Sequence, residues 1–231
     1  MYSSLRRRLT DYSNPNSLGS RMRARRSQAF VTLIEASFQR RGECRILDVG
    51  GTVNYWNILP RDFLLSRNVR IVLQNLTATP LAPQAAQIFE SVAGNACSMP
   101  EFTDAQFDLV HSNSVIEHVG LWPQMCAMAK EVRRIGRAYY VQTPNYWFPI
   151  EPHYLVPFLH WLPFPLRIQL SLRMRMGTWP RSRDVDQAVS AQQAAILLNA
   201  RMMRALFPDA RHEKERVLGL PKSLLAIRPE P

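Results

Sequence analysis

The sequence predicts an α/β fold built on a mostly parallel sheet. Short apolar runs recur at residues 45–49, 70–73, 107–111 and 137–141, with helical or loop material between them. This alternation is expected of parallel strands joined by crossover connections. Residues 211–218 and 223–227 form two further strand-like runs, and the connection of four residues between them suits a hairpin rather than a parallel crossover. An antiparallel strand should therefore finish the sheet.

Helical spacing marks the segments between these runs. Phe30, Leu33, Ile34 and Phe38 recur as on one face of a helix, which predicts an amphipathic helix over residues 26–41 that ends near Gly42. Residues 124–135 and 189–206 are expected to form crossover helices. Residues 1–25 are polar and basic with turn-forming residues, so we interpret them as a basic N-terminal arm.

Composition limits the domain count and the class of partner. A chain of 231 residues and 26.6 kDa is long enough for one well-buried core, so residues 26–231 are expected to form a single domain. The net charge of +11 and pI near 10.3 favour an anionic partner, namely nucleic acid, a membrane surface or a phosphorylated substrate. A solvated basic face without any partner is the alternative.

The cysteines indicate a reducing compartment. The chain has three cysteines, an odd number, and they lack CxxC spacing. They are Cys44, Cys97 and Cys126, and this pattern argues against a disulfide framework and against a zinc site. We therefore expect no metal and a cytoplasmic location. No apolar run follows the arginines at 6–8, which argues against a secretory signal, although the Arg- and Ser-rich start also fits an organelle transit peptide.

An aromatic insertion, residues 146–180, interrupts the α/β pattern. It combines aromatic, leucine, proline and arginine residues without a clean period. A membrane-spanning helix needs about 20 uninterrupted apolar residues, and Pro157, Pro163 and Pro165 exclude one here. The segment instead suits an acceptor lid that contacts an anionic membrane peripherally, or a cluster that packs onto the core.

The most informative motif is the strand that ends in Asp48-Val49-Gly50-Gly51. Glycine lets the backbone turn sharply and approach a ligand where a Cβ would clash. In a parallel sheet this loop lies at the carboxyl edge, where ligands bind. The motif is neither a GxGxxG dinucleotide fingerprint nor a Walker loop.

This stretch resembles motif I of class I S-adenosylmethionine-dependent methyltransferases, and residues 45–227 resemble their type 11 branch. The run Phe107-Asp108-Leu109-Val110-His111-Ser112-Asn113-Ser114-Val115-Ile116-Glu117-His118-Val119 matches the fourth-strand motif of that family over many consecutive positions. The resemblance implies a Rossmann-like, mostly parallel seven-stranded sheet with an antiparallel terminal strand. It also implies S-adenosylmethionine as cofactor.

The resemblance implies cofactor-binding roles for residues that follow successive strands. They are Asp48, Gly50, Gly51, Asn75, Asn95, Ala96, Ser112 and Asn113. Asn75 and Asn95 stand where the family usually has acids, and an amide offers one acceptor and one donor group in place of a carboxylate. Asn75→Asp and Asn95→Asp are therefore expected to keep or improve cofactor affinity.

Candidate acceptor-binding residues follow the fourth and fifth strands. They are His118, Tyr146, Trp147 and His153. Methyl transfer depends on positioning and needs no universal nucleophile. His118 is the candidate base because its ordinary pKa suits proton removal, although a structural role is favoured for it.

The sequence thus predicts a methyltransferase acting on an unidentified small-molecule, lipid or saccharide acceptor. The alternative is a methyltransferase-like module without catalysis, which would bind anionic lipid or nucleic acid through its basic arm and insertion. Nucleic acid is the less favoured partner, because no stacking-rich recognition module is visible.

Overall fold

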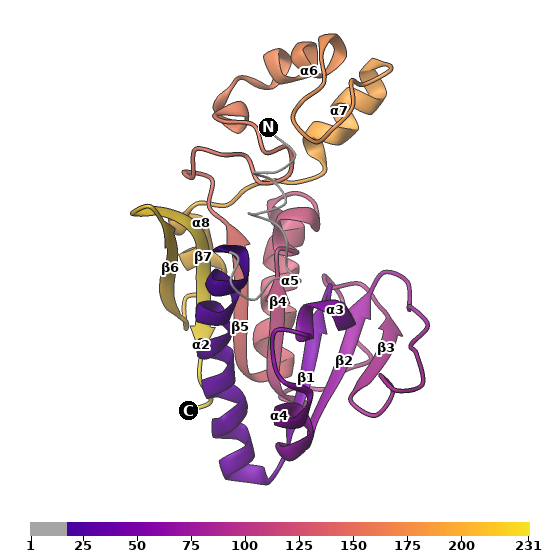
Figure 1. Ribbon diagram of the computed structural model, residues 1–231, viewed down its shortest axis with the longest axis vertical. Helices are drawn as coiled ribbons and strands as arrows, with labels where there is room; N and C mark the ends of the chain where they lie inside the picture. The colour runs from indigo at the N-terminus through magenta and orange to yellow at the C-terminus, as the bar shows by residue number, and fades with distance from the viewer. Residues whose placement is uncertain (1–17) are drawn as a thin grey trace.

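The computed structural model describes residues 18–231, with side chains from residue 27 onward. Residues 1–17 of the predicted arm, including the arginines at 6–8, lie outside the described residues. In chain order the elements are α2 (Leu18–Arg41), β1 (Cys44–Val49), α3 (Val53–Trp56), α4 (Arg61–Ser66), β2 (Val69–Asn75), β3 (Phe89–Ala93), β4 (Phe107–Asn113), η1 (Ile116–His118), α5 (Trp122–Ile135), β5 (Gly136–Pro144), η2 (Leu159–Trp161), α6 (Phe164–Arg173), α7 (Val185–Gln193), α8 (Ala200–Leu206), β6 (Arg211–Val217) and β7 (Leu220–Arg228) (Figure 1).

The sheet confirms the predicted fold class. Its seven strands lie in the order β3-β2-β1-β4-β5-β7-β6. Strands β1 to β5 pair in parallel, and β7 runs antiparallel to both β5 and β6. The short edge strand β3 was not among the predicted strands, because its half-exposed FESVA sequence shows neither an apolar run nor a clear alternation.

Alternating side chains of the strands build one core on each face of the sheet. Ile46, Ile71 and Leu109 point to the face covered by α2, α3 and α4. Their neighbours Leu47, Val72 and Val110 point to the face covered by α5 and α8. The result is a three-layer α/β/α arrangement, in which the carboxyl ends of the parallel strands point toward the upper end in Figure 1.

A separate unit follows β5, and we call it the insertion subdomain (residues 145–198). Its two ends meet: Asn145 pairs with Leu198, and the Tyr146 amide donates to the Leu198 carbonyl at 2.8 Å. Between them, η2, α6 and α7 rise above the carboxyl edge of the sheet (Figure 1). Tyr154, Leu159 and Met176 form its own small core.

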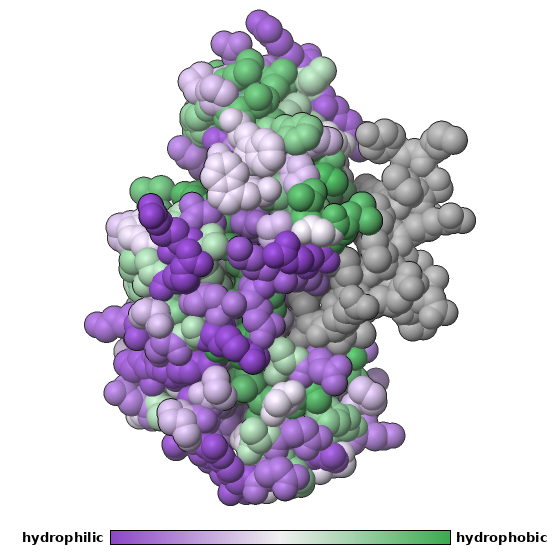
Figure 2. All heavy atoms as spheres, turned by 90° about the vertical axis from the view of Figure 1, so that its left-hand side faces the viewer, coloured by the Kyte–Doolittle hydropathy of each residue, from purple (hydrophilic) through white to green (hydrophobic). Residues whose placement is uncertain are grey.

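Large apolar side chains remain exposed on the insertion subdomain. Figure 2 shows apolar and aromatic side chains gathered over the upper part of the molecule. The members exposed by more than a third of their surface are Trp147, Ile150, Leu155, Phe158, Trp161, Phe164, Leu166, Met174, Trp179 and Val185. Among the described residues, no helix is both long enough and apolar enough to cross a membrane.

Two predicted boundaries are corrected by the structure. Helix α2 begins at Leu18 rather than at residue 26, because its first turns carry helix-forming residues without the apolar period that the prediction used. The predicted turn at residues 219–222 is only Leu218-Gly219, both left-handed at φ 49° and 81°. These angles are those of the two-residue hairpin turn that matches strand twist.

The predicted helix over residues 189–206 is wrong, since the structure has two helices there. α7 ends at Gln193 and α8 begins at Ala200. Between them the chain is not helical, and the Ile196 amide donates to the Glu117 carbonyl at 2.7 Å. The Asn199 side chain then accepts from the amides of the first turn of α8, which fixes a new helix start.

Candidate functional site

The glycine loop after β1 is attached to the end of β2. The Gly50 amide donates to the Gln74 carbonyl at 2.8 Å. Gly50 has a left-handed φ of 71°, and a Cβ there would lie 2.4 Å from Cγ2 of Val115. Glycine is therefore required at this position by the chain itself, before any ligand is considered.

Asp48 lies beneath this loop rather than in an open crevice. Its side chain is 1% exposed, and both of its oxygens are used. Oδ2 accepts from the Trp56 indole at 2.7 Å, and Oδ1 lies 2.7 Å from Nδ1 of His111. A Cβ on Gly51 would lie 2.0 Å from Oδ2. The predicted cofactor residue Asp48 thus acts here as a buried support for the loop.

His111 belongs to an aromatic cluster that sequence reasoning missed. Its ring stacks on Tyr140 at a centroid distance of 5.5 Å, and Phe30 meets it edge-on at 5.4 Å. Its second nitrogen lies 3.2 Å from the Tyr55 hydroxyl. A histidine inside a predicted apolar strand was the available signal, because a buried imidazole requires polar partners.

Asn75 and Asn95, which stand where the family usually has acids, have different structural roles. Nδ2 of Asn75 donates to the Gly51 carbonyl at 2.9 Å, so this side chain connects β2 to the glycine loop. Oδ1 of Asn95 instead accepts from the Cys97 amide at 2.9 Å. A carboxylate could replace the acceptor Asn95 but not the donor Asn75.

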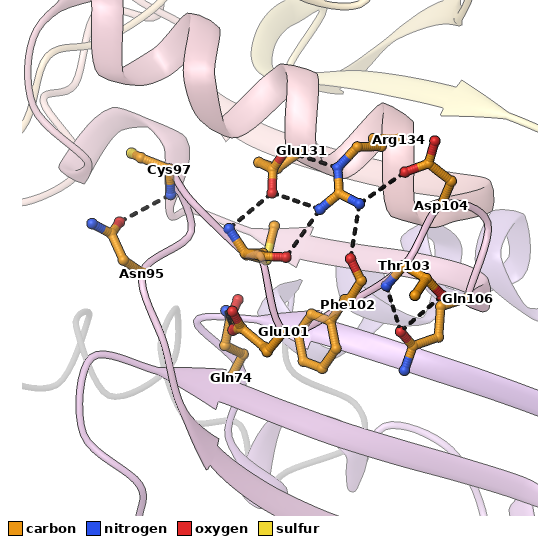
Figure 3. Close-up of polar contacts among 11 residues, drawn as sticks. Gln74, Asn95, Cys97, Glu101, Phe102, Thr103, Asp104, Gln106, Glu131 and Arg134 are labelled. Atoms are coloured by element: carbon orange, nitrogen blue, oxygen red, sulfur yellow. Dashed lines mark hydrogen bonds and ion pairs between the residues drawn. The ribbon is translucent and has the colours of Figure 1, made fainter.

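Arg134 holds the loop that carries Asn95 and Ala96. Figure 3 shows its guanidinium among acceptors from this loop. It donates to the carbonyls of Met99 and Phe102 at 3.0 and 2.8 Å and to Glu131 at 2.8 Å. Glu131 in turn accepts from the Met99 amide at 2.8 Å. The hydrogen bond from Arg134 lowers the pKa of Glu131.

The end of β4 brings polar groups to the same edge of the sheet. Asn113 is half-buried at the strand end, and the Ser114 amide donates to the Gln142 carbonyl at 2.9 Å. Ser112 is fully buried, and its hydroxyl has no partner among the described residues. Ser112 therefore lies behind the edge, whereas Gly50 and Asn113 lie on it.

Leu76, which directly follows Asn75, was not predicted as a site residue. Its side chain is 83% exposed beside the polar strand ends. A large apolar group left in water at this edge offers a surface that a flat ligand could cover. The signal in the sequence was a leucine immediately after a predicted strand end.

A cavity of about 810 Å³ lies where the insertion subdomain meets η1. Three of the four predicted acceptor residues, His118, Tyr146 and His153, line it. Trp147 is not among the lining residues, and its side chain is 61% exposed. Much of the remaining wall is aromatic or aliphatic. The structure thus gathers groups that lie far apart in the sequence around one cavity.

Two ionisable side chains near this cavity have shifted pKa values. Burial raises the pKa of Glu117, whose carboxylate accepts from Thr143 at 2.9 Å. Burial alone would lower the pKa of His153, but its hydrogen bond to Glu151 and the nearby carboxylate charges raise it overall. Both pKa values are raised because carboxylate charge lies in a poorly solvated place.

Known proteins are similar to the central part of the chain. Residues 47–138 match the family model described as "Methyltransferase domain". Two uncharacterized proteins from two strains of Mycobacterium tuberculosis are each 34% identical over 88 residues, which is 38% of this chain and 26% of theirs. The chain therefore spans about a quarter of the length of these curated relatives.

Solved structures resemble the chain at low sequence identity. A putative Zn-dependent alcohol dehydrogenase from Rhodobacter sphaeroides is 9% identical with a TM-score of 0.50, over 82% of this chain and 85% of that one. The 1,6-didemethyltoxoflavin-N1-methyltransferase of Burkholderia thailandensis, solved with S-adenosylhomocysteine, is 13% identical with a TM-score of 0.49, over 100% of this chain and 87% of that one. At 9% identity, the likeness to the dehydrogenase structure concerns the fold alone.

Proposed function

From the match of residues 47–138 to a methyltransferase family model, we propose that the chain is a class I methyltransferase of the type 11 branch, which transfers a methyl group from S-adenosylmethionine to an acceptor in the 810 Å³ cavity. One observation carries the proposal. His118, which lines the cavity, lies in η1 directly after β4, and β4 ends at the same sheet edge as the glycine loop. A methyl donor at this edge and an acceptor in the cavity would lie on either side of the short segment between β4 and η1, which suits direct transfer of the methyl group.

The residues at the sheet edge fit the cofactor. Gly50 leaves room for close approach of the backbone, and Asn113 offers polar groups at the end of β4. Leu76 offers the apolar surface that an adenine ring would cover. S-adenosylmethionine, when bound, supplies an activated methyl group on a sulfonium, and the acceptor displaces it in line.

The chain itself contributes position and a proton acceptor. The insertion subdomain supplies most of the cavity wall, so an acceptor bound there would contact its aromatic and aliphatic side chains. His118 is the side chain that would receive a proton from an acceptor hydroxyl or amine. Its Nδ1 donates to the Ala194 carbonyl at 2.7 Å, which leaves Nε2 as the basic nitrogen.

The cavity wall favours an acceptor with an apolar body and an anionic group. Arg167 lines the cavity, its guanidinium lies 5.3 Å from the centre of the Phe164 ring, and its buried Nε has no partner among the described residues. Such a donor gains most from a carboxylate or phosphate. A lipid or a lipid-linked saccharide is the class that fits best, and the exposed apolar side chains above the cavity agree with this.

Calorimetry with S-adenosylmethionine and S-adenosylhomocysteine tests the cofactor part. Leu76→Ala should weaken binding about tenfold, since it removes apolar surface worth roughly 1.5 kcal/mol when covered. Leu218→Ala is the matched control, because Leu218 is 98% exposed in the hairpin turn at residues 218–219. Absence of binding by the unchanged protein, or equal affinity in both variants, would contradict the proposal.

The acceptor part is tested by transfer of labelled methyl groups to amphiphiles that carry a carboxylate or phosphate, compared with neutral analogues. The unchanged protein should prefer the anionic set, and Arg167→Gln should remove that preference. Equal transfer to neutral and anionic amphiphiles by the unchanged protein would argue against the role given to Arg167.

A further inference from the structure

A cluster of two imidazoles and one carboxylate lies at η1, near the point where the chain leaves β5 and enters the insertion subdomain. Glu117, His118 and His153 each offer one ligand atom, and these atoms lie within 4.8 Å of one another. Glu117 is 1% exposed, whereas both histidines line the cavity. The set combines a buried carboxylate with two imidazoles open to one side.

Hydrogen bonds fix the tautomers of both histidines. Nδ1 of His118 must donate to the carbonyl of Ala194 at 2.7 Å, since a carbonyl can only accept. Nδ1 of His153 faces the Glu151 carboxylate at 2.7 Å and donates to it for the same reason. In the neutral state, each imidazole is therefore left with a lone pair on Nε2.

These two lone pairs face each other. The Nε2 atoms of His118 and His153 lie 3.2 Å apart, and the two rings are nearly perpendicular at 84°. Two neutral acceptors at this distance repel unless a proton or a metal cation lies between them. Two imidazoles on one zinc ion at about 2.0–2.1 Å have their nitrogens about 3.3 Å apart in tetrahedral geometry.

Glu117 supplies the negative charge that such a cation needs. Its Oε2 accepts from Thr143 at 2.9 Å, but its buried Oε1 has no partner among the described residues. A carboxylate oxygen without a donor in the interior is costly. A bound cation would satisfy both this oxygen and the two imidazole nitrogens.

We propose that Glu117, His118 and His153 bind a divalent transition-metal ion, with an open coordination position toward the cavity. Two imidazoles and one carboxylate suit zinc and its first-row neighbours rather than magnesium or calcium, which prefer oxygen ligands. The bonds from the imidazoles to Glu151 and to Ala194 are the outer-shell partners that metal-bound histidines usually have. The proposal replaces the expectation from the cysteine pattern that the chain holds no metal.

The open position gives the ion a role that rests on the proposed function. A metal-bound hydroxyl loses its proton more readily than a free one, so an acceptor hydroxyl would be activated there and release its proton to solvent. With Nε2 of His118 bound to the ion, this activation would take the place of the base role that the proposed function gives to His118. Binding of the ion is a separate question from methyl transfer, and it can be measured without S-adenosylmethionine.

The test is calorimetric titration of the chelator-treated full chain with Zn²⁺ alone, supported by metal analysis after gel filtration. The unchanged protein should bind one equivalent and retain it. His118→Ala and His153→Ala should each lose it, and Glu151→Gln should weaken binding by about 10–100-fold, as for other outer-shell changes. Mg²⁺ should not compete.

His212→Ala is the matched control, because His212 lies in β6 and contacts the Phe207 carbonyl at 2.9 Å, away from the cavity. It should bind Zn²⁺ like the unchanged protein. Failure of the unchanged protein to bind, or equal loss in the His212 variant, would overturn the proposal. Affinity for S-adenosylhomocysteine, measured on the same variants, should stay unchanged, so a failure of the metal site is distinguishable from a failure of the cofactor site.

Discussion

Replacing Asn75 by Asp exchanges the donor that holds the glycine loop for an acceptor. The Nδ2 group of Asn75 lies 2.9 Å from the Gly51 carbonyl, and Gly51 is buried. After Asn75→Asp, two oxygens face each other there and the carbonyl loses its donor. Leaving a buried polar group unsatisfied costs about 1–3 kcal/mol. For a chain of this length, about 2 kcal/mol corresponds to a fall in Tm of about 4–8 °C.

Asn95→Asp is the matched control, since it makes the same chemical change where the amide oxygen already accepts. The carboxylate keeps the acceptor for the Cys97 amide, so Tm should change little. The sequence alone led to the expectation that both changes keep or improve cofactor affinity. The structure leads us to expect this only for Asn95→Asp.

Thermal unfolding followed by circular dichroism, with calorimetry using S-adenosylhomocysteine, checks the pair. The fall in Tm caused by Asn75→Asp should become smaller below about pH 4, because a protonated carboxyl group can again donate to the Gly51 carbonyl. Unchanged Tm and unchanged affinity in Asn75→Asp at pH 7 would refute the role assigned to this hydrogen bond.

Three further outcomes are expected. Asp48→Asn should lower the free energy of unfolding by roughly 3 kcal/mol or more, because the buried indole and imidazole both lose a charged acceptor. Urea denaturation measures this change, and a loss below about 1 kcal/mol would contradict the role of Asp48 as a buried support for the glycine loop. Glu131 has a pKa lowered by Arg134, so its contribution to stability is present above its ordinary pKa and is lost as the pH falls through the lowered value. Glu131→Gln should therefore flatten the dependence of stability on pH below about 4.5, and an unchanged slope in urea titrations at several pH values would argue against this. Finally, the chain should float with anionic but not neutral vesicles, less so in high salt and in the double variant Trp161→Ala with Phe164→Ala; no flotation at low salt would rule out the membrane-facing lid.

The exposed apolar side chains explain why vesicles are the appropriate probe. Trp147, Leu155 and Phe158 are exposed by 61%, 41% and 52% on the insertion subdomain. Apolar surface of this extent, mixed with arginines, has the composition of an interfacial segment. A water-borne acceptor would remain compatible with the cavity if flotation fails.

The sheet was readable from the sequence because its signals are local. Apolar runs such as residues 45–49 and 107–111 identify buried parallel strands by composition alone, and the glycine pair at 50–51 marks the loop after the first of them. The edge strand β3 was missed because an edge strand buries little and therefore leaves little apolar pattern.

The sequence by itself determined the fold class, the family resemblance and which strand ends carry polar residues. It did not determine what those side chains contact. Whether Asn75 donates, whether Asp48 is open or buried, and whether His118 meets His153 depend on segments separated along the chain by 24, 63 and 35 residues. Such contacts leave no periodicity in a single sequence. They are decided only when packing brings strands β1, β2 and β4 and the insertion subdomain into one arrangement.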